Sequence, residues 1–293
     1  MEIKQFQNKI KDLPTISAVA SQINQAVKNE SLTAGALGEI ISRDPSLTTK
    51  VLRLANSAYY GLPREVSQLN RAITILGMDT IKNLALTVSV FRAFCCANNP
   101  GLSVNLKGLW YHSLGTAVAA KAILSQNDAL QRDEALAEQA FLCGIIHDVG
   151  KIAITQNLPN EMAEVLTRMH EAKIPQYEAE KEIIGFSHQR AGQALADAWN
   201  FPEEYLKVIR QHHAPTLTAS IPPKTAQLIM AVYIGNKMAK AMQLGTSTDP
   251  LAAKVTPEDL HQAGITSNDL PGIITVTKAS YTTLLSQWTY ESC

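Results

Sequence analysis

The chain has 293 residues, of which 46% are hydrophobic and 18% are charged. Lys and Arg together number 26, as do Asp and Glu, so the formal net charge is zero. The hydrophobic content argues against intrinsic disorder, and the balanced charge argues against a strongly basic protein that coats nucleic acid or membranes. The length predicts about two domains.

Targeting and membrane signals are not found in the sequence. No segment approaches the roughly 18–20 consecutive apolar residues that a membrane span needs. The N-terminus, MEIKQFQNKIKDLP, has neither an apolar h-region nor a small-residue cleavage site. The four cysteines, Cys95, Cys96, Cys143 and Cys293, form no C-x-x-C spacing, so we expect reduced thiols. These features predict a cytoplasmic protein with no membrane partner.

Apolar residues recur at helical spacing almost everywhere in the chain. In the N-terminal part this spacing predicts a helix near residues 16–27, another after Asp44, and two more on either side of Gly77. Asp44 is a predicted N-cap, because Pro45 follows it at the first helical position. No stretch shows the period of two that strands require. The sequence therefore predicts an all-α fold.

The clearest break lies at residues 97–101, which combine turn formers with no apolar periodicity. Later helices are predicted at about 106–125, at about 134–146, after Ser187, after Pro202, at about 226–242, and from near Thr256 and Ser267 in the tail. We therefore predict three parts: an N-terminal helical part over residues 1–100, a second over 101–245, and a C-terminal helical extension over 246–293.

Histidines gather in the second part. Five of the seven lie on or at the ends of the helices predicted after residue 106. His112, His188 and His212 line up with apolar residues, which places them on buried helix faces. His213 lies about 100° further round its helix than His212. One buried histidine is usually a hydrogen-bonded core residue, but several in one domain favour a shared site.

The strongest signal is FLCGIIHDVGK, residues 141–151. An apolar helix ends in His147 and Asp148, so an imidazole and a carboxylate enter a dry environment where an unpaired carboxylate costs several kcal/mol. Nitrogen and oxygen ligands together suit divalent zinc, iron or manganese. Such an ion lowers the pKa of bound water from 15.7 towards about 7, which favours hydrolysis. Lys151 could hold a phosphate as a point charge; the alternative is a solvated lysine at a helix end.

These motifs resemble known families. GIIHDVGK resembles the motif of the HD superfamily of metal-dependent phosphohydrolases. The segments LPTISAVASQI, IISRDPSLTTKVLRLANSAYYG and LNRAITILGMDTIKNLAL are very similar to the opening of HDOD domains, the HD-related output domains of bacterial signalling proteins. His112 matches the histidine on the helix before the HD pair. His188 and the adjacent His212 and His213 match positions occupied in the HD-GYP branch. The resemblance covers roughly residues 10–245.

The resemblance implies an N-terminal helical bundle packed on an HD-domain-like helical bundle. Tyr59 and Tyr60 belong to the HDOD-like signature and are expected to pack between the two. The resemblance also implies one or two divalent ions (Fe, Mn or Zn), with catalytic roles for Asp148 and Lys151 in an active enzyme. The metal ligands that it implies are His112, His147, Asp148, His188, His212 and His213.

The chain departs from the active enzymes at two places. HD phosphohydrolases use a further aspartate on a late helix, and the matching stretch here, AVYIGNKMAK, holds Asn236. The GYP element is absent, because residues 214–216 after the paired histidines read Ala-Pro-Thr. We therefore do not expect hydrolysis of cyclic-di-GMP.

Two functions remain open. The first is a metal-binding bacterial signalling output module, whose partner is a signalling protein or a phosphorylated small molecule such as a nucleotide. The alternative is an active phosphohydrolase or phosphodiesterase, in which a metal-activated hydroxide attacks a phosphoester. Nucleic-acid binding is not expected, because the helix over residues 79–91 carries only Lys82 as a positive charge and is too apolar to face phosphates.

Overall fold

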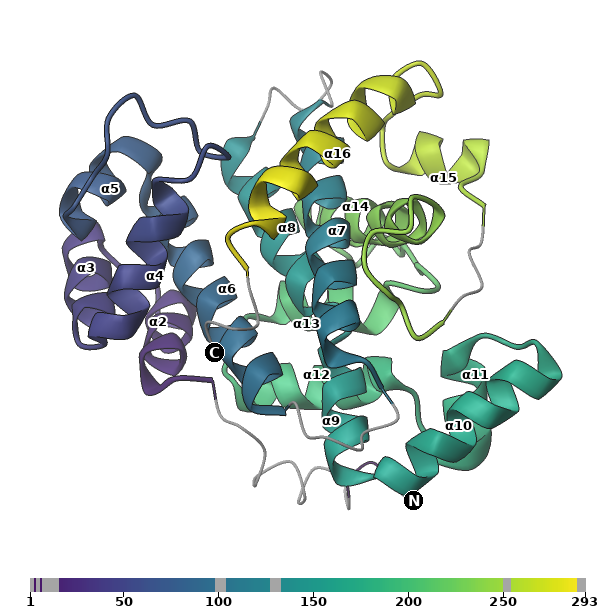
Figure 1. The fold of residues 1–293 in the computed structure, drawn as a ribbon. Helices are drawn as coiled ribbons and strands as arrows, with labels where there is room; N and C mark the ends of the chain where they lie inside the picture. Colours follow the sequence, from purple (N-terminus) through teal and green to yellow (C-terminus); the bar gives the residue numbers. More distant parts are fainter. Residues whose placement is uncertain are drawn as a thin grey trace.

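The computed structural model describes residues 16–97, 104–126, 133–249 and 254–288, together with Ile3 and Phe6, and these residues contain helices and no strand (Figure 1). The all-α prediction is confirmed. The helices of the N-terminal part are α2 (Ala18–Lys28), α3 (Ala34–Ser42), α4 (Pro45–Ala55), α5 (Leu69–Leu76) and α6 (Met78–Ala97).

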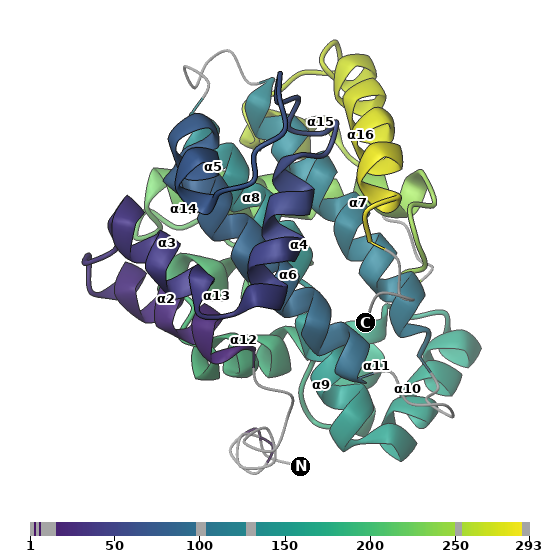
Figure 2. The same ribbon diagram turned by 60° about the vertical axis from the view of Figure 1, so that its left-hand side comes forward.

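The rest of the chain is arranged around one long central helix, α7 (Leu106–Ser125) (Figure 1). The other helices of this part are α8 (Glu134–Ile146), α9 (Val149–Asn157), α10 (Pro159–Ala172), α11 (Gln176–Ile183), α12 (His188–Ala198), α13 (Glu203–Gln211) and α14 (Pro223–Ala241). Two helices of the tail, α15 (Pro257–Gln262) and α16 (Leu270–Leu285), follow them. Helix α16 lies along α7 in both views (Figures 1 and 2).

Local signals in the N-terminal part act as predicted. The Asp44 carboxylate accepts a hydrogen bond from the backbone N–H of Leu47 at 2.9 Å, and Pro45 opens α4. Gly77 separates α5 from α6 with φ of 89°, a backbone conformation that favours glycine. The predicted boundary at residues 97–101 falls largely outside the described ranges, and the three-part division remains a prediction.

Helix α6 joins the two parts of the molecule. It packs against α4 on one side and α8 on the other (Figure 2). Residues 80–91 of this helix are all buried. The apolar sequence of α6 is therefore explained by core packing.

The tyrosines of the loop after α4 contact the second part of the molecule. The Tyr59 ring centroid lies 6.2 Å from that of Phe141 on α8. Lys121 on α7 places its Nζ 5.2 Å from the Tyr59 ring and 5.6 Å from the Tyr60 ring, and it pairs with the buried Glu138 at 2.5 Å. The expected packing of this tyrosine pair between the two halves is confirmed.

The central helices approach each other closely at two glycines. A Cβ atom at Gly144 on α8 would lie 2.4 Å from the Cα of Ala117 on α7, and one at Gly235 on α14 would lie 3.0 Å from the backbone nitrogen of Ala120. Both values are shorter than ordinary contacts between carbon atoms or between carbon and nitrogen. The end of α8 and the middle of α14 therefore lie close to α7.

Some features differ from the predictions. Helices α10 and α11 fall in a stretch where no helix was predicted, and α16 begins at Leu270, three residues after Ser267. Cys96 and Cys143 are free thiols, but Cys95 is disulfide-bonded, so the expectation of reduced thiols is wrong at that position. Cys293 lies outside the described residues. Among the described helices, none has the length and apolar character of a membrane span.

Substitution of Gly150 on α9 tests whether the contact between α9 and α12 constrains the second part of the chain. A Cβ there would lie 1.9 Å from the carbonyl oxygen of His188 and 2.5 Å from the backbone nitrogen of Gly192, both on α12. We expect Gly150→Ala to lower the free energy of unfolding by about 3 kcal/mol or more, because backbone cannot give way as a flexible side chain can.

Urea denaturation measures this effect. Gly35→Ala in α3 is the matched control, because a Cβ there meets no atom within 4 Å, and alanine favours a helix by up to about 1 kcal/mol over glycine. Equal stabilities for the two variants would show that the α9–α12 crossing does not constrain the fold.

Candidate metal centre

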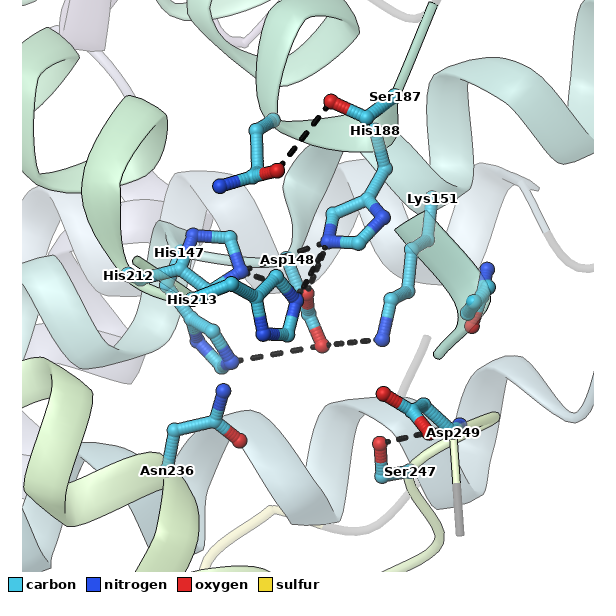
Figure 3. A network of polar contacts seen from close by, with 12 residues as sticks. His147, Asp148, Lys151, Ser187, His188, His212, His213, Asn236, Ser247 and Asp249 are labelled. Carbon is cyan, nitrogen blue, oxygen red and sulfur yellow. Dashed lines mark hydrogen bonds and ion pairs between the residues drawn. The ribbon is translucent and has the colours of Figure 1, made fainter. Parts of the chain in front are cut away.

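The HD pair lies in the turn between α8 and α9. His147 follows the last residue of α8, and Asp148 precedes α9; both are fully buried. The Asp148 side chain does not cap α9. Its Oδ2 instead accepts a hydrogen bond from Lys151 Nζ at 2.8 Å (Figure 3). Because α8 is apolar and buried, its end places this carboxylate in the protein interior, where it requires partners.

Two histidines from elsewhere in the chain lie beside one oxygen of that carboxylate, and a third lies beside one of them. Asp148 Oδ1 lies 3.4 Å from the Nε2 atoms of both His188 and His212. His188 Nε2 is in turn 3.0 Å from His213 Nε2. The possible ligand atoms of these four residues all lie within 4.8 Å of one another, and we call the group the three-histidine cluster.

The other oxygen faces a second group. Asp148 Oδ2 lies 3.4 Å from His147 Nε2 and 4.0 Å from His112 Nε2. We call Asp148, His112 and His147 the two-histidine cluster; its ligand atoms also lie within 4.8 Å of one another. Asp148 belongs to both clusters and stands between them (Figure 3).

In three of the histidines, a hydrogen bond at Nδ1, the outer ring nitrogen that faces away from Asp148, determines that the lone pair of the ring lies on Nε2. A carbonyl or carboxylate oxygen only accepts, so a ring Nδ1 bonded to one carries the proton and leaves an unprotonated Nε2 on the neutral ring. Three rings are held in this way: His188 by Glu180 Oε2 (2.7 Å), His212 by the Ile209 carbonyl (2.8 Å) and His147 by the Gly144 carbonyl (2.7 Å). Their Nε2 lone pairs therefore point inward.

An inward ring of lone pairs around a carboxylate is electrostatically unfavourable without a cation. Two atoms show this directly, since Asp148 Oδ1 and His147 Nε2 are buried and make no hydrogen bond. Outer-nitrogen hydrogen bonds to carboxylate or carbonyl oxygen are the usual support of metal-bound histidines. The residues present therefore fit a divalent transition metal.

His112 differs from the other histidines because it contacts Asn236. Its Nε2 lies 3.0 Å from Asn236 Oδ1 on α14, and the carbonyl oxygen of the amide accepts, so His112 Nε2 carries the proton. A protonated nitrogen has no lone pair for a metal. Asn236 therefore occupies one ring nitrogen of the two-histidine cluster.

The protonation states also suit metal binding. Burial lowers the pKa of His212 to about 3 and holds those of His112 and His213 well below the usual range. Burial alone would raise the pKa of Asp148, but the Lys151 ammonium group holds it well below its usual value. Metal ligation requires neutral imidazole and ionised carboxylate, which is the state that these shifts favour.

Glu180 on α11 is a functional residue that sequence reasoning missed. Its Oε2 accepts hydrogen bonds from both the backbone nitrogen (2.6 Å) and the ring Nδ1 (2.7 Å) of His188. Its Oε1 accepts from Gln176 Nε2 at 2.8 Å, and Gln176 accepts from the Thr248 hydroxyl. Because no helix was predicted at α11, nothing in the sequence pointed this carboxylate at the site.

A small cavity of about 120 Å³ reaches the three-histidine cluster. His212, His213 and Asn236 line it, and so do Lys240 and Asp249, which sequence reasoning also missed. The remaining lining residues are Pro175, Tyr177, Tyr233 and Lys237. The Tyr177 ring stacks on His213 with centroids 5.1 Å apart. The centre is therefore buried but accessible to a small group.

The structure brings every predicted site residue together. All six predicted metal ligands belong to one of the two clusters. Lys151 is fully buried against Asp148, so the alternative of a solvated lysine is wrong. The remaining histidines, His170 and His261, are exposed.

Several solved structures share this fold. A "Putative phosphohydrolase" from Shewanella amazonensis is 24% identical, with 97% of this chain and 98% of that chain covered and a TM-score of 0.69. An HDOD domain protein of unknown function from Geobacter sulfurreducens is 23% identical over 97% and 94% of the two chains, with a TM-score of 0.68. A "Putative signal transduction protein" from Marinobacter aquaeolei is 20% identical over 98% and 61%, with a TM-score of 0.76.

Sequence comparison gives the family. An uncharacterised protein of Treponema pallidum is 26% identical over 206 residues, which are 70% of this chain but only 38% of that protein. The family model of the HDOD domain matches residues 13–215, well over half of the chain. The opening segments that suggested HDOD lie within this range, and so do the histidines of the HD-like motif. The chain therefore belongs to the HDOD family.

Proposed function

We propose that this HDOD protein binds one divalent metal ion in the three-histidine cluster. We propose further that it acts in signal transduction through the metal-bound or metal-free state of this cluster. The observation that carries the proposal is the convergence of the His188 and His212 lone pairs on Asp148 Oδ1 at 3.4 Å, with both outer nitrogens hydrogen-bonded. The shared fold of the Marinobacter protein, whose name refers to signal transduction, supports the proposed role.

The proposal of a single ion follows from the difference between the clusters. The three-histidine cluster offers three imidazoles and one carboxylate oxygen, a donor set that suits four-coordinate zinc and also iron. In the two-histidine cluster, His112 donates to Asn236, and Asp148 is the only carboxylate. Two divalent ions would share one negative charge, which Lys151 already balances at 2.8 Å.

Phosphoester hydrolysis is the second candidate, and the cavity favours it. A histidine group that served only the core would not need a cavity lined by lysines beside it. When bound, the metal lowers the pKa of a water molecule and supplies hydroxide at neutral pH. Lys151 would stabilise charge that develops on phosphate oxygens, and the buried walls would exclude bulk water.

Metal content tests the main proposal. In protein purified without chelators or affinity-tag metals, plasma mass spectrometry is expected to find about one equivalent of zinc or iron per chain. Asp148→Ala and His188→Gln should lose it, because each removes a ligand of the three-histidine cluster. His170→Gln, at an exposed histidine outside both clusters, should keep it.

The same measurement tests the number of ions. Asn236→Asp adds a carboxylate beside His112 and should raise the content towards two equivalents. Wild-type protein that stays empty after metal is supplied would rule out the centre, and an Asn236→Asp variant that still holds one ion would rule out our account of the stoichiometry.

The metal-free protein should lose stability in acid. Unfolded histidines take up protons below about pH 6.5, whereas the buried His112, His212 and His213 have lowered pKa values and stay neutral in the folded chain. Stability is therefore greatest above pH 6.5, and by about pH 5 it should fall by roughly 2 kcal/mol for each such residue.

Urea unfolding of chelated protein between about pH 8 and pH 5 measures this slope. His212→Gln should make the dependence of the unfolding free energy on pH less steep, because one of the three proton-binding groups of the unfolded chain is removed. A free energy of unfolding that does not change over this range would contradict neutral burial of these rings.

Hydrolysis is tested with bis(p-nitrophenyl) phosphate and the metal found in the purified protein. If the protein hydrolyses phosphoesters, we expect turnover that Asp148→Ala abolishes. Lys151→Met should lower the rate by about 100-fold, which is the usual effect of losing one group that stabilises developing charge. Equal rates in wild type and Asp148→Ala would eliminate catalysis and leave the signalling role without chemistry.

A further inference from the structure

Lys240 on helix α14 forms a buried ion pair that involves none of the residues of the two histidine clusters. Lys240 lies one turn after Asn236, and its Nζ is 3.1 Å from Asp249 Oδ2 in the segment after the helix. The two side chains are only 8% and 4% exposed. Desolvation makes a buried ion pair a weak source of stability, so a further role for this one is reasonable.

The pair lines the same cavity as the metal centre. Lys240 and Asp249 border the 120 Å³ space together with His212 and His213 (Figure 3 shows Asp249 below Lys151). Pockets that enclose a whole small molecule usually measure about 300–1,000 Å³. This cavity therefore admits only a small head group, while the rest of a ligand must remain outside, past residues such as the half-buried Tyr177 and Tyr233.

The charge around the cavity favours an anion once a metal is bound. The charged groups at and around the cavity are Asp148, Glu180, Asp249 and Asp259 on the negative side and Lys151, Lys237 and Lys240 on the positive side. They sum to one negative charge, so one divalent ion changes the sum to one positive charge. A buried excess charge is costly, and a small anion in the cavity offsets it. This step rests on the proposed metal centre.

We propose that the cavity receives the phosphoryl group of a phosphorylated small molecule, with Lys240 as a binding residue that Asp249 positions. A terminal phosphoryl group has three oxygens, one more than a carboxylate, so it can contact the lining Lys237 and Lys240 and the three-histidine cluster together. The Lys240 ammonium group has three hydrogens and can bind the phosphoryl group without releasing Asp249.

Titration with inorganic phosphate, followed by calorimetry at constant ionic strength, tests the proposal. Wild-type protein should bind phosphate, and Lys240→Met should weaken binding by about tenfold or more with unchanged metal content. Lys224→Met is the matched control on the same helix: Lys224 is 74% exposed and pairs with Asp133 away from the cavity. It should bind phosphate as the wild type does. If Lys240→Met does not fold, Lys240→Gln keeps a polar end and is used instead.

Three results would overturn the proposal: equal phosphate affinity in wild type and the Lys240 variant, no binding by metal-containing wild type up to about 10 mM, or equal affinity for acetate. Metal content measured on the same samples separates this failure from that of the metal centre. If the wild type holds no metal, the titration is read on the metal-free protein, where binding that depends on Lys240 supports the phosphoryl site and its absence overturns it.

Discussion

The structure of the second half of the chain depends on one buried carboxylate. Asp148 is about 1% exposed, and the helices around it supply its partners: Lys151 from α9, His188 from α12 and His212 from the end of α13. An ionised carboxylate in such a place costs several kcal/mol unless cations or donors surround it. The inward lone pairs of the histidines add to this need, so an electropositive centre is required where the helices meet.

Most of the fold could be predicted because its signals are local. The Asp44 cap, the break at Gly77 and the apolar helix that ends at the HD pair depend on neighbouring residues, and the structure has all three. Four of the five clustered histidines were also foreseen as buried, because all but His213 lie on a face or an end that the helical period marks as buried. Asn236 was placed through family resemblance rather than through its own surroundings.

The supporting residues could not be predicted, because they act across the fold. Glu180 reaches His188 from a helix whose short, polar sequence resembles a surface segment, yet its side chain is fully buried. Lys240 and Asp249 are common surface residues nine positions apart, and only the cavity shows that their pairing is buried beside the histidines. Chemistry-bearing residue types were visible in the sequence, but the hydrogen bonds that orient them depend on tertiary contacts.

The contact between α9 and α12 has a consequence for ion selectivity. At Gly150 the two backbones touch, with room for no side chain between them, and Asp148 and His188 lie within two residues of this point on their helices. The distance between the backbones that carry these two donors is therefore determined by contact of main chain against main chain. A cation of larger radius would have to separate whole helices, whereas one of smaller radius would leave its ligands too distant. If an ion binds here, discrimination by size would thus come from the backbone itself.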